Sequence, residues 1–187
     1  EHDLVGLNEL MTDDHVFISF NVYDRADAWK RSVVFRYPKD ELVAGGALTR
    51  AMWTSTTLGS MKLVSGAADT MWFASHGGTS RRLELHAWPD GAATVEQFPV
   101  TISSWNEGVY TSSGPGGGEW LSRTDGRITG GWRAPGSLGF AWTASPRDGR
   151  PHPYIRVVRL DEASLAVVAE PDLWSVNGAW AYPSVAA

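Results

Sequence analysis

The sequence contains no cysteine, which excludes disulfide bonds, thiolate metal sites and cysteine nucleophiles together. It also has no Asn-x-Ser/Thr sequon, so N-glycosylation gives no indication of the compartment. No apolar run approaches the roughly 20 residues that a membrane helix needs, and we expect no membrane partner. The net charge of −5 argues against a nucleic-acid partner, because phosphate backbones favour basic surfaces.

Motifs for metals, nucleotides and common nucleophiles are missing as well. There is no H-E-x-x-H and no G-x-S-x-G, and the glycine-rich stretch "GPGGGE" (114–119) lacks the Lys-Ser/Thr of a phosphate-binding loop. We interpret that stretch as a flexible or tightly turning loop. The histidines have no ligand spacing, so we expect no metal and no cofactor. They are His2, His15, His76, His86 and His152.

The first residues, "EHDLVG", include no initiator methionine and no basic-then-apolar leader, so we expect a mature, processed or excised segment. The absence of cysteine is compatible with secretion and equally with the cytosol. Of these two, we expect an extracellular or periplasmic location.

The 187 residues include ten tryptophans and several runs in which apolar and polar residues alternate. In "TMWFASHGGTSRRLELHAW" (70–88), Leu83 and Leu85 alternate with polar residues beyond a glycine turn. Alternation of this kind is typical of half-buried strands. The stretch therefore predicts a β-hairpin.

The same hairpin pattern occurs three times, and each copy ends at an Asp-containing turn. The other two copies begin at "HVFISFNVYD" and "LGFAWTAS". We expect Phe17, Trp72 and Phe140 to be equivalent, and Trp72 and Trp142 to be buried. A further strand follows each hairpin, and a small-residue strand precedes the second and third, which suits a crowded axis. The first hairpin has no clear strand before it, whereas "GAWAYPSVAA" at the end of the chain resembles one.

These patterns predict an all-β chain with blade-like units at about 12–58, 60–102 and 126–175 and the start of a further unit at 178–187. The expected strands lie near 15–23, 32–37, 48–57, 61–67, 70–75, 82–88, 94–101, 127–133, 138–144, 154–160 and 165–169.

This layout resembles a β-propeller of the sialidase-like, Asp-box (BNR-related) bacterial type, with about three four-stranded antiparallel blades. The closest approach to an Asp box, "SRTDGRITGGW", has Ser122, Asp125, Gly126 and Trp132 at altered spacings. The alternative is an all-β sandwich with irregular hairpins. Propellers typically have four to eight blades, so a propeller would be incomplete as a single chain. A second copy, or the rest of a parent chain, would then close it.

In a propeller, the loops inside the hairpins and the connections between blades open on one face. Aromatic rings, arginines and carboxylates in these loops are suited to a polyhydroxylated or acidic ligand, although loop tips are also polar for solvation alone. The candidate ligand-binding residues are Asp24, Arg25, Asp27, Trp29, Arg31, His76, Arg81, Trp105, Glu107, Tyr110, Trp120, Asp125, Arg147, Asp148, Arg150 and His152.

The resemblance implies a carbohydrate-directed propeller, which is either a glycan-binding module or part of a sialidase-like glycoside hydrolase. Catalytic residues cannot be assigned to positions in this sequence. The alternative is a non-catalytic propeller that serves as a scaffold for protein interactions.

Overall fold

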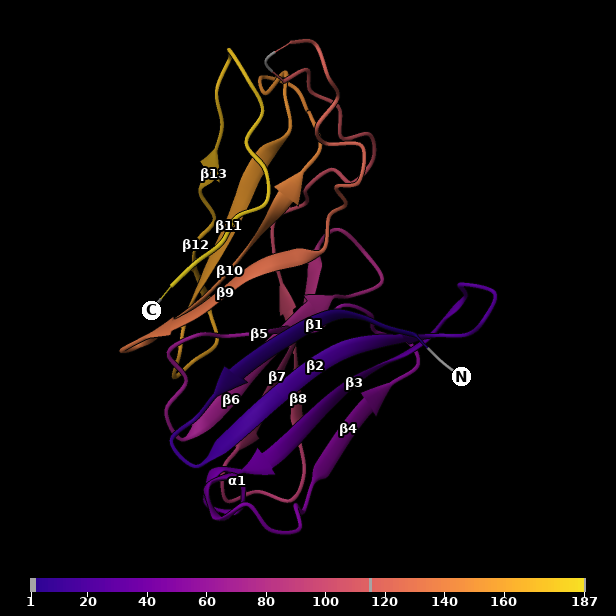
Figure 1. The fold of residues 1–187 in the computed structure, drawn as a ribbon. Coiled ribbons are helices and arrows are strands. Elements are labelled where there is room, and N and C mark those ends of the chain that lie inside the picture. Colours follow the sequence, from indigo (N-terminus) through magenta and orange to yellow (C-terminus); the bar gives the residue numbers. More distant parts are fainter. Residues whose placement is uncertain (1–2, 115, 187) are drawn as a thin grey trace.

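The computed structural model describes the backbone of residues 3–114 and 116–186, and side chains from residue 9 onward within these ranges. The fold is all-β with one short helix, and its strands form three antiparallel sheets (Figure 1). No helix in the described part is both long enough and apolar enough to cross a bilayer.

Each sheet is a meander in which the strands lie in chain order. Sheet A contains β1 (Asp3–Met11), β2 (His15–Tyr23), β3 (Trp29–Pro38) and β4 (Ala51–Ser55), with helix α1 (Lys39–Ala44) between the last two. Sheet B contains β5 (Lys62–Leu63), β6 (Thr70–His76), β7 (Arg82–Pro89) and β8 (Glu96–Thr101). Sheet C contains β9 (Ile128–Ala134), β10 (Ser137–Ala144), β11 (Tyr154–Asp161) and β12 (Val167–Ala169), and β13 (Asp172–Leu173) also pairs with β11.

The structure confirms the all-β prediction and the hairpins at the centre of each sheet. It corrects the prediction that the first hairpin has no strand before it, because β1 pairs with β2. A register shift between Val5 and Asn8 interrupts this pairing. Such a shift disturbs the period-two alternation by which a strand is identified in sequence.

The predicted strand at the end of the chain is not formed within the described residues. Residues 174–186 form an irregular tail with a bend at 176–178, and residue 187 lies outside the described residues. The Tyr182 amide donates to Thr143 Oγ1 (3.1 Å), and Thr129 Oγ1 donates to the carbonyl of Pro183 (3.0 Å). The tail therefore lies against sheet C through isolated hydrogen bonds rather than by strand pairing.

The three sheets stack in the order A, B, C, with aromatic rings packed between them. The Phe17 ring meets Trp88 of sheet B edge-on at 5.7 Å, and His76 of sheet B meets Trp142 of sheet C at 4.7 Å. Trp142 is fully buried as expected, whereas Trp72 is only half-buried.

The expected equivalence of Phe17, Trp72 and Phe140 is wrong for Phe140. Phe17 and Trp72 lie on the faces that point to the next sheet, whereas Phe140 shares the face of Trp142 that packs on the preceding one. In a strand, an offset of one residue reverses the face.

The first strands of sheets B and C approach each other closely. The Ser65 amide donates to the Gly131 carbonyl (2.9 Å), and the Arg133 amide donates to the Ser65 carbonyl (2.7 Å). A Cβ atom on Gly131 would lie 2.9 Å from the Leu63 carbonyl oxygen. Only glycine allows this approach, which agrees with the expectation of small residues at a crowded axis.

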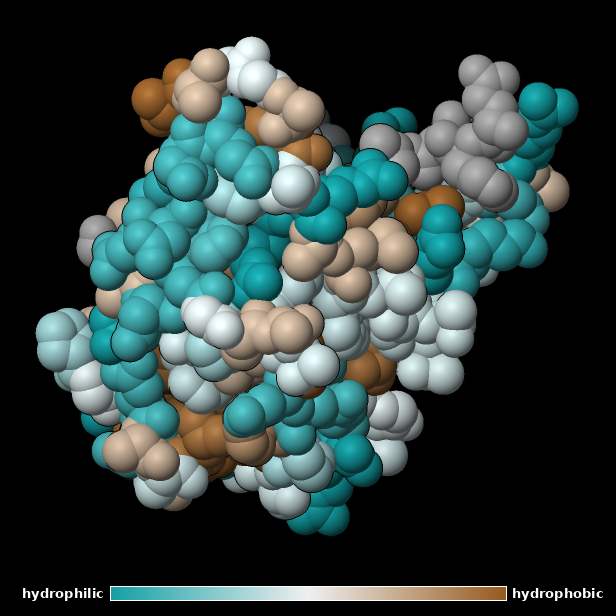
Figure 2. Space-filling view, turned by 90° about the horizontal axis from the view of Figure 1, so that it is seen from below, coloured by the Kyte–Doolittle hydropathy of each residue, from teal (hydrophilic) through white to brown (hydrophobic). Residues whose placement is uncertain are grey.

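Asp90, in the turn after β7, ties sheet B to sheet A at the end of the molecule that carries α1. Its carboxylate accepts hydrogen bonds from Thr12 Oγ1 (2.7 Å) and from the Asp14 amide (3.3 Å), and it lies 2.9 Å from His15 Nδ1. Arg36 Nη1 donates to the Pro89 carbonyl beside it (3.0 Å). The surface of this end is largely hydrophilic (Figure 2), and Asp90 supplies a specific polar contact within it.

We expect Asp90→Ala to lower the free energy of unfolding by about 1–3 kcal/mol, because Thr12 is buried and loses its partner. Asp148→Ala is the matched control, since Asp148 is exposed in a loop, and it should change stability by less than about 0.5 kcal/mol. Urea denaturation measures both variants. Equal stability of the two would show that the Asp90 contacts do not hold sheets A and B together.

Candidate functional site

The connections between sheets and the loops inside the hairpins meet at one end of the stack. The Ser60 amide donates to Asn21 Oδ1 (3.0 Å), which joins the A-to-B connection to β2. The Ser145 amide donates to the Asn106 carbonyl (2.9 Å), which joins the B-to-C connection to sheet C. Each connection runs from the last strand of one sheet to the first strand of the next, so the meander order places both at this end.

A polar cleft lies where β5 and β9 begin, and we call it the inter-sheet cleft. It consists of two adjoining cavities of about 140 and 260 Å³ that share Ser60, Arg127 and Ile128. A cavity of roughly 150 Å³ accommodates one six-membered ring. The first cavity is further lined by Ser19, Phe20, Asn21, Met61, Lys62 and Thr129, and the second by Gly59, Ser75, His76, Glu107, Asp125 and Gly126.

Arg127 and Asp125 form an ion pair at the centre of the cleft. Arg127 Nε lies 2.8 Å from both carboxylate oxygens of Asp125, and Nη2 makes a further contact. Burial alone would raise the pKa of Asp125, but the hydrogen bonds and charge of Arg127 outweigh it, so the pKa is lowered. Because a guanidinium has five N–H groups, three of those on Arg127 are not engaged by Asp125. About 44% of its side chain is exposed.

The two cavities differ in charge. Lys62 and Arg127 are the charged residues of the first cavity, whereas the second also contains the carboxylates of Glu107 and Asp125. Burial lowers the pKa of Lys62. The cleft therefore offers cationic donors at one end and carboxylate acceptors at the other.

A cluster of aromatic side chains packs between sheets B and C, directly beside the cleft. His76 Nε2 donates to the Gly126 carbonyl (2.8 Å), and its ring lies 4.7 Å from those of Trp105 and Trp142. Since Nε2 is the donor, Nδ1 is an acceptor, and no described residue supplies it with a partner. A Cβ atom on Gly126 would collide with Trp105 and lie 2.9 Å from the hydroxyl of Tyr110. Glycine is thus required where the connection closes over the cluster.

Tyr110 in this cluster is unsuited to act as a nucleophile. Its pKa is raised by burial and further by the charges of Glu107 and Asp125, so the phenol stays protonated at neutral pH. Tyr110, Glu107 and Asp125 nevertheless lie close together, as expected for residues of a loop that opens on one face of the molecule.

Five of the residues predicted from the sequence lie at the cleft or in the aromatic cluster beside it. Glu107 and Asp125 line the cleft with His76, and Trp105 and Tyr110 lie in the cluster.

The predicted residues of the first hairpin form its turn and flanks. Asp24 Oδ1 accepts the amides of Ala26 (2.9 Å) and Ala28 (3.0 Å), and its other oxygen pairs with Lys30 (2.7 Å). The hydrogen bond from Lys30 is the main reason that the pKa of Asp24 falls to about 2. This carboxylate therefore shapes the turn. Beside it, Arg25 and Asp27 are exposed, the latter with φ of 57°, and the ring of Trp29 lies against Gly59 at the edge of the cleft.

A second predicted group lines a separate groove at the loop between β10 and β11, formed by Arg147, Asp148 and Arg150. Arg150 pairs with Asp172 (2.7 Å) and lies over the ring of Tyr154. Arg147 Nη1 donates to the Ser104 carbonyl (3.2 Å). These arginines serve contacts within the chain.

The remaining predicted residues are not part of either cavity of the cleft. Arg31 pairs with Val22 across β3 and β2, which places it on the outer face of sheet A. Trp120 is 43% exposed near Tyr182 of the tail. Arg81 is exposed, and His152 is half-buried.

Sequence reasoning missed Asn21, Ser60 and Lys62 as site residues, and it placed Arg127 in a loop of interest without including it among the candidates. Asn21 carried a usable signal, because it is a polar residue in the otherwise strand-forming run "FISFNVY", and a buried amide needs partners. Ser60 carried no such signal in the sequence. Its position depends on the path of the backbone, which gives it a positive φ of 56°.

Comparison of the chain with protein-family models and with curated proteins finds no match. Within the described residues, no three His, Asp or Glu side chains converge as a metal site.

We expect Gly126→Ala to destabilise the chain by about 1–3 kcal/mol through overpacking against Trp105. Gly91→Ala is the control, because a Cβ atom there meets nothing within 4 Å and φ is not positive. Thermal melts followed by tryptophan fluorescence compare the two. A Gly126→Ala protein as stable as the control would contradict the tight closure over the cluster.

Acid should destabilise the fold through two buried histidines. Burial lowers the pKa of His76 and His86 from 6.5 to about 4, and it outweighs the opposing influence of Gly126 and Asp125 on His76 and of Glu84 on His86. Between these pH values the unfolded chain binds protons that the folded chain does not. The free energy of unfolding should therefore fall as the pH is lowered from 6.5 to 4, by up to about 1.4 kcal/mol per pH unit for each histidine.

Urea denaturation at a series of pH values from 7 to 4 measures this slope. The carboxylates with lowered pKa lose their contribution mainly below this window, so they do not mask it. A profile that is flat between pH 6.5 and 4 is the result that would refute the prediction.

Proposed function

We propose that the chain is a three-blade part of a β-propeller that binds a glycan in the inter-sheet cleft. The observation that carries the proposal is the cleft itself, a cavity of ring size with cations at one end and carboxylates at the other.

The propeller part of the proposal is supported by the order and contacts of the sheets. Each is a meander of about four strands in chain order, and the sheets stack face to face. The first strands adjoin, with a parallel bridge between Ser65 and Trp132. Blades of a propeller repeat radially with their first strands at the axis, and a sandwich would not require this repeated placement of first strands.

The glycan part is supported by the chemistry of the lining. The amide and hydroxyl groups of Asn21, Ser60 and Thr129 already make hydrogen bonds within the chain, and each keeps the capacity for one more, while Arg127 offers charged donors. Glu107 and Asp125 accept hydrogen bonds from hydroxyl groups. A polyhydroxylated ligand uses donors and acceptors together, and charge-assisted hydrogen bonds are the stronger ones.

We favour binding over hydrolysis of the glycan. The raised pKa of Tyr110 disfavours a tyrosine nucleophile next to Glu107. Retaining and inverting glycosidases need two carboxylates at defined separations, and in this cleft Asp125 is held by Arg127.

A glycan array probed with the purified chain, followed by titration of the sugars that bind, tests the proposal. Binding should change the tryptophan fluorescence, since Trp105 and Trp142 lie against His76 of the cleft. Arg127→Ala should weaken binding by about tenfold or more, because it removes charged donors. A native chain that binds no sugar would refute the proposal and favour the scaffold alternative.

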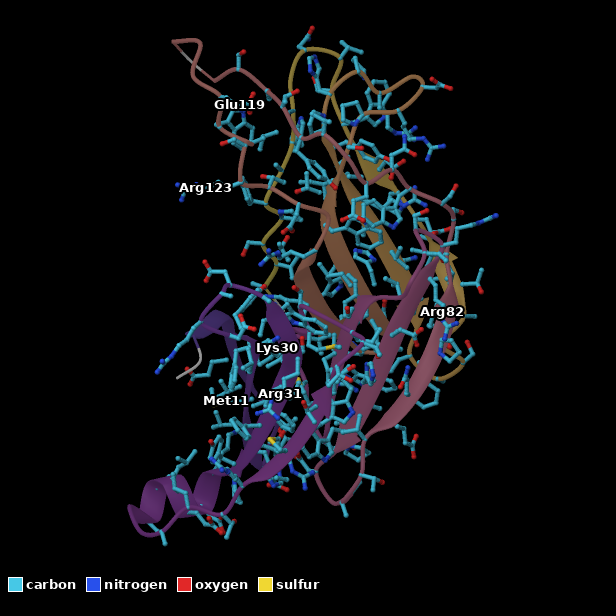
Figure 3. All side chains as sticks on the ribbon, turned by 90° about the vertical axis from the view of Figure 1, so that its right-hand side faces the viewer. Met11, Lys30, Arg31, Arg82, Glu119 and Arg123 are labelled. Carbon is cyan, nitrogen blue, oxygen red and sulfur yellow. The ribbon has the colours of Figure 1, made fainter. Side chains whose placement is uncertain are left out.

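Arg123→Ala is the matched control in the same connection. Its side chain projects away from the body of the molecule (Figure 3), and the residue is exposed. Its affinity should equal that of the native chain, and the melting temperatures of both variants verify that the fold is intact.

A further inference from the structure

The outer face of sheet A is an apolar surface that no other described element covers. In Figure 1 its four strands form the layer nearest the viewer, and Figure 3 shows Met11 on the outer side. Phe20, Val22 and Val33 form a cluster there, separate from the main core. Met11 and Met52 are 56% and 52% exposed. We call this surface the A face. Met11 and Met52 are its exposed apolar side chains, Ile18 and Phe35 are half-buried, Phe20 and Val33 are buried beneath them, and Arg31 and Arg50 lie at the margin.

A second apolar surface lies at the opposite end of the stack, where the tail crosses sheet C. Trp174, Val176, Trp180 and Tyr182 are 43–62% exposed. The tail is held there by the contacts with Thr129 and Thr143, and the Trp180 amide donates to the Pro153 carbonyl (2.9 Å). We call these four exposed tail residues the C face.

We infer that the A face of one copy of the chain docks on the C face of a second copy. The inference rests on the propeller part of the proposed function and is independent of the glycan. The two surfaces are the ones left exposed at the ends of a stack whose internal interfaces, A on B and B on C, bury the corresponding faces. Docking of A on C adds one more layer to the stack, with the tail lying between the outer face of sheet C and the A face of the second copy.

The side chains of the two faces are chemically complementary. The A face presents methionine, which packs favourably against aromatic rings, and arginine, which stacks on them. Arg50 already lies 5.0 Å over the ring of Phe35. The C face presents two tryptophans and a tyrosine. Beyond Arg159 the chain contains four acidic residues and no basic ones, but Glu162, Glu170 and Asp172 already pair with arginines of the same chain, so the complementarity of the two faces rests on their methionine and aromatic side chains.

Two copies are sufficient to close the assembly. Two chains supply six sheets, within the typical range of four to eight for propellers. In the dimer, the A face of each copy packs on the C face of the other copy. The same heterologous contact therefore forms twice. This arrangement leaves neither face exposed and places two inter-sheet clefts around one axis.

Sedimentation across a dilution series of the native chain tests the inference. We expect a dimer that Met52→Glu and Trp180→Glu each weaken by about 30-fold or more, the effect typical of central interface residues. Both residues are half-exposed, so neither change should prevent folding, and circular dichroism checks this. Val43→Glu is the control, since Val43 lies on α1 and is 89% exposed.

A mixing experiment distinguishes A-on-C docking from like-with-like docking. A mixture of the Met52→Glu and Trp180→Glu proteins retains one contact with two native faces, so a dimer should reappear in the mixture. Docking of A on A would leave the Trp180→Glu protein dimeric on its own, and docking of C on C would leave the Met52→Glu protein dimeric on its own. Either result would overturn the inference.

A native chain that is monomeric at every concentration would also overturn the inference and would favour the rest of a parent chain as the occupant. A mass that grows beyond two copies with concentration would overturn the closed pair. A monomer that still binds its glycan would leave the cleft proposal intact, so the two failures are distinguishable.

Discussion

The close approach of the first strands of sheets B and C is the constraint on which the rest of the molecule depends. It requires Gly131, because any Cβ atom there would meet the Leu63 carbonyl, and it is held by the two backbone hydrogen bonds of Ser65. Where two strands start side by side, the connections that lead into them must also meet. The inter-sheet cleft is the consequence of that meeting. A bulkier residue at Gly131 would therefore disturb the cleft and the packing between the sheets together.

The long connection between sheets B and C is fixed to the stack by its ends and by the cluster below it. Ser103 and Glu170 join its start to sheet C, and His76 holds its last turn through Gly126. The neutral state of His76 is part of this arrangement, because a charge among buried aromatic rings would lack compensation. His76 therefore both supports the cleft and contributes to the sensitivity of the fold to acid, whereas His86 acts between sheets A and B, against Phe73 and Trp53. The burial of His76 thus affects both the cleft and the stability of the fold.

The proposed glycan site and the proposed contacts between two copies lie on different surfaces of the stack. The cleft lies at the end where the strands β5 and β9 begin, whereas the A face and the C face lie at the two ends of the sheet order. The lining of the cleft does not include the exposed residues of either face, such as Met52 and Trp180, although the buried Phe20 belongs both to the A face and to the first cavity. Glycan binding and assembly can thus be measured and altered separately.

The sequence by itself determined the strands and the repeated meander, because alternation and turn residues are local signals that survive without tertiary context. It also identified the loops that contribute His76, Glu107 and Asp125. Strand β1 was missed because its pairing contains a register shift, and the terminal strand was overpredicted because small and aromatic residues suit a strand that here has no ladder partner. Only the tertiary structure decided that Asn21, Ser60, Lys62 and Arg127 share a cleft. Their proximity depends on the crossing of separate sheets, which is a non-local contact that no pattern along the chain records.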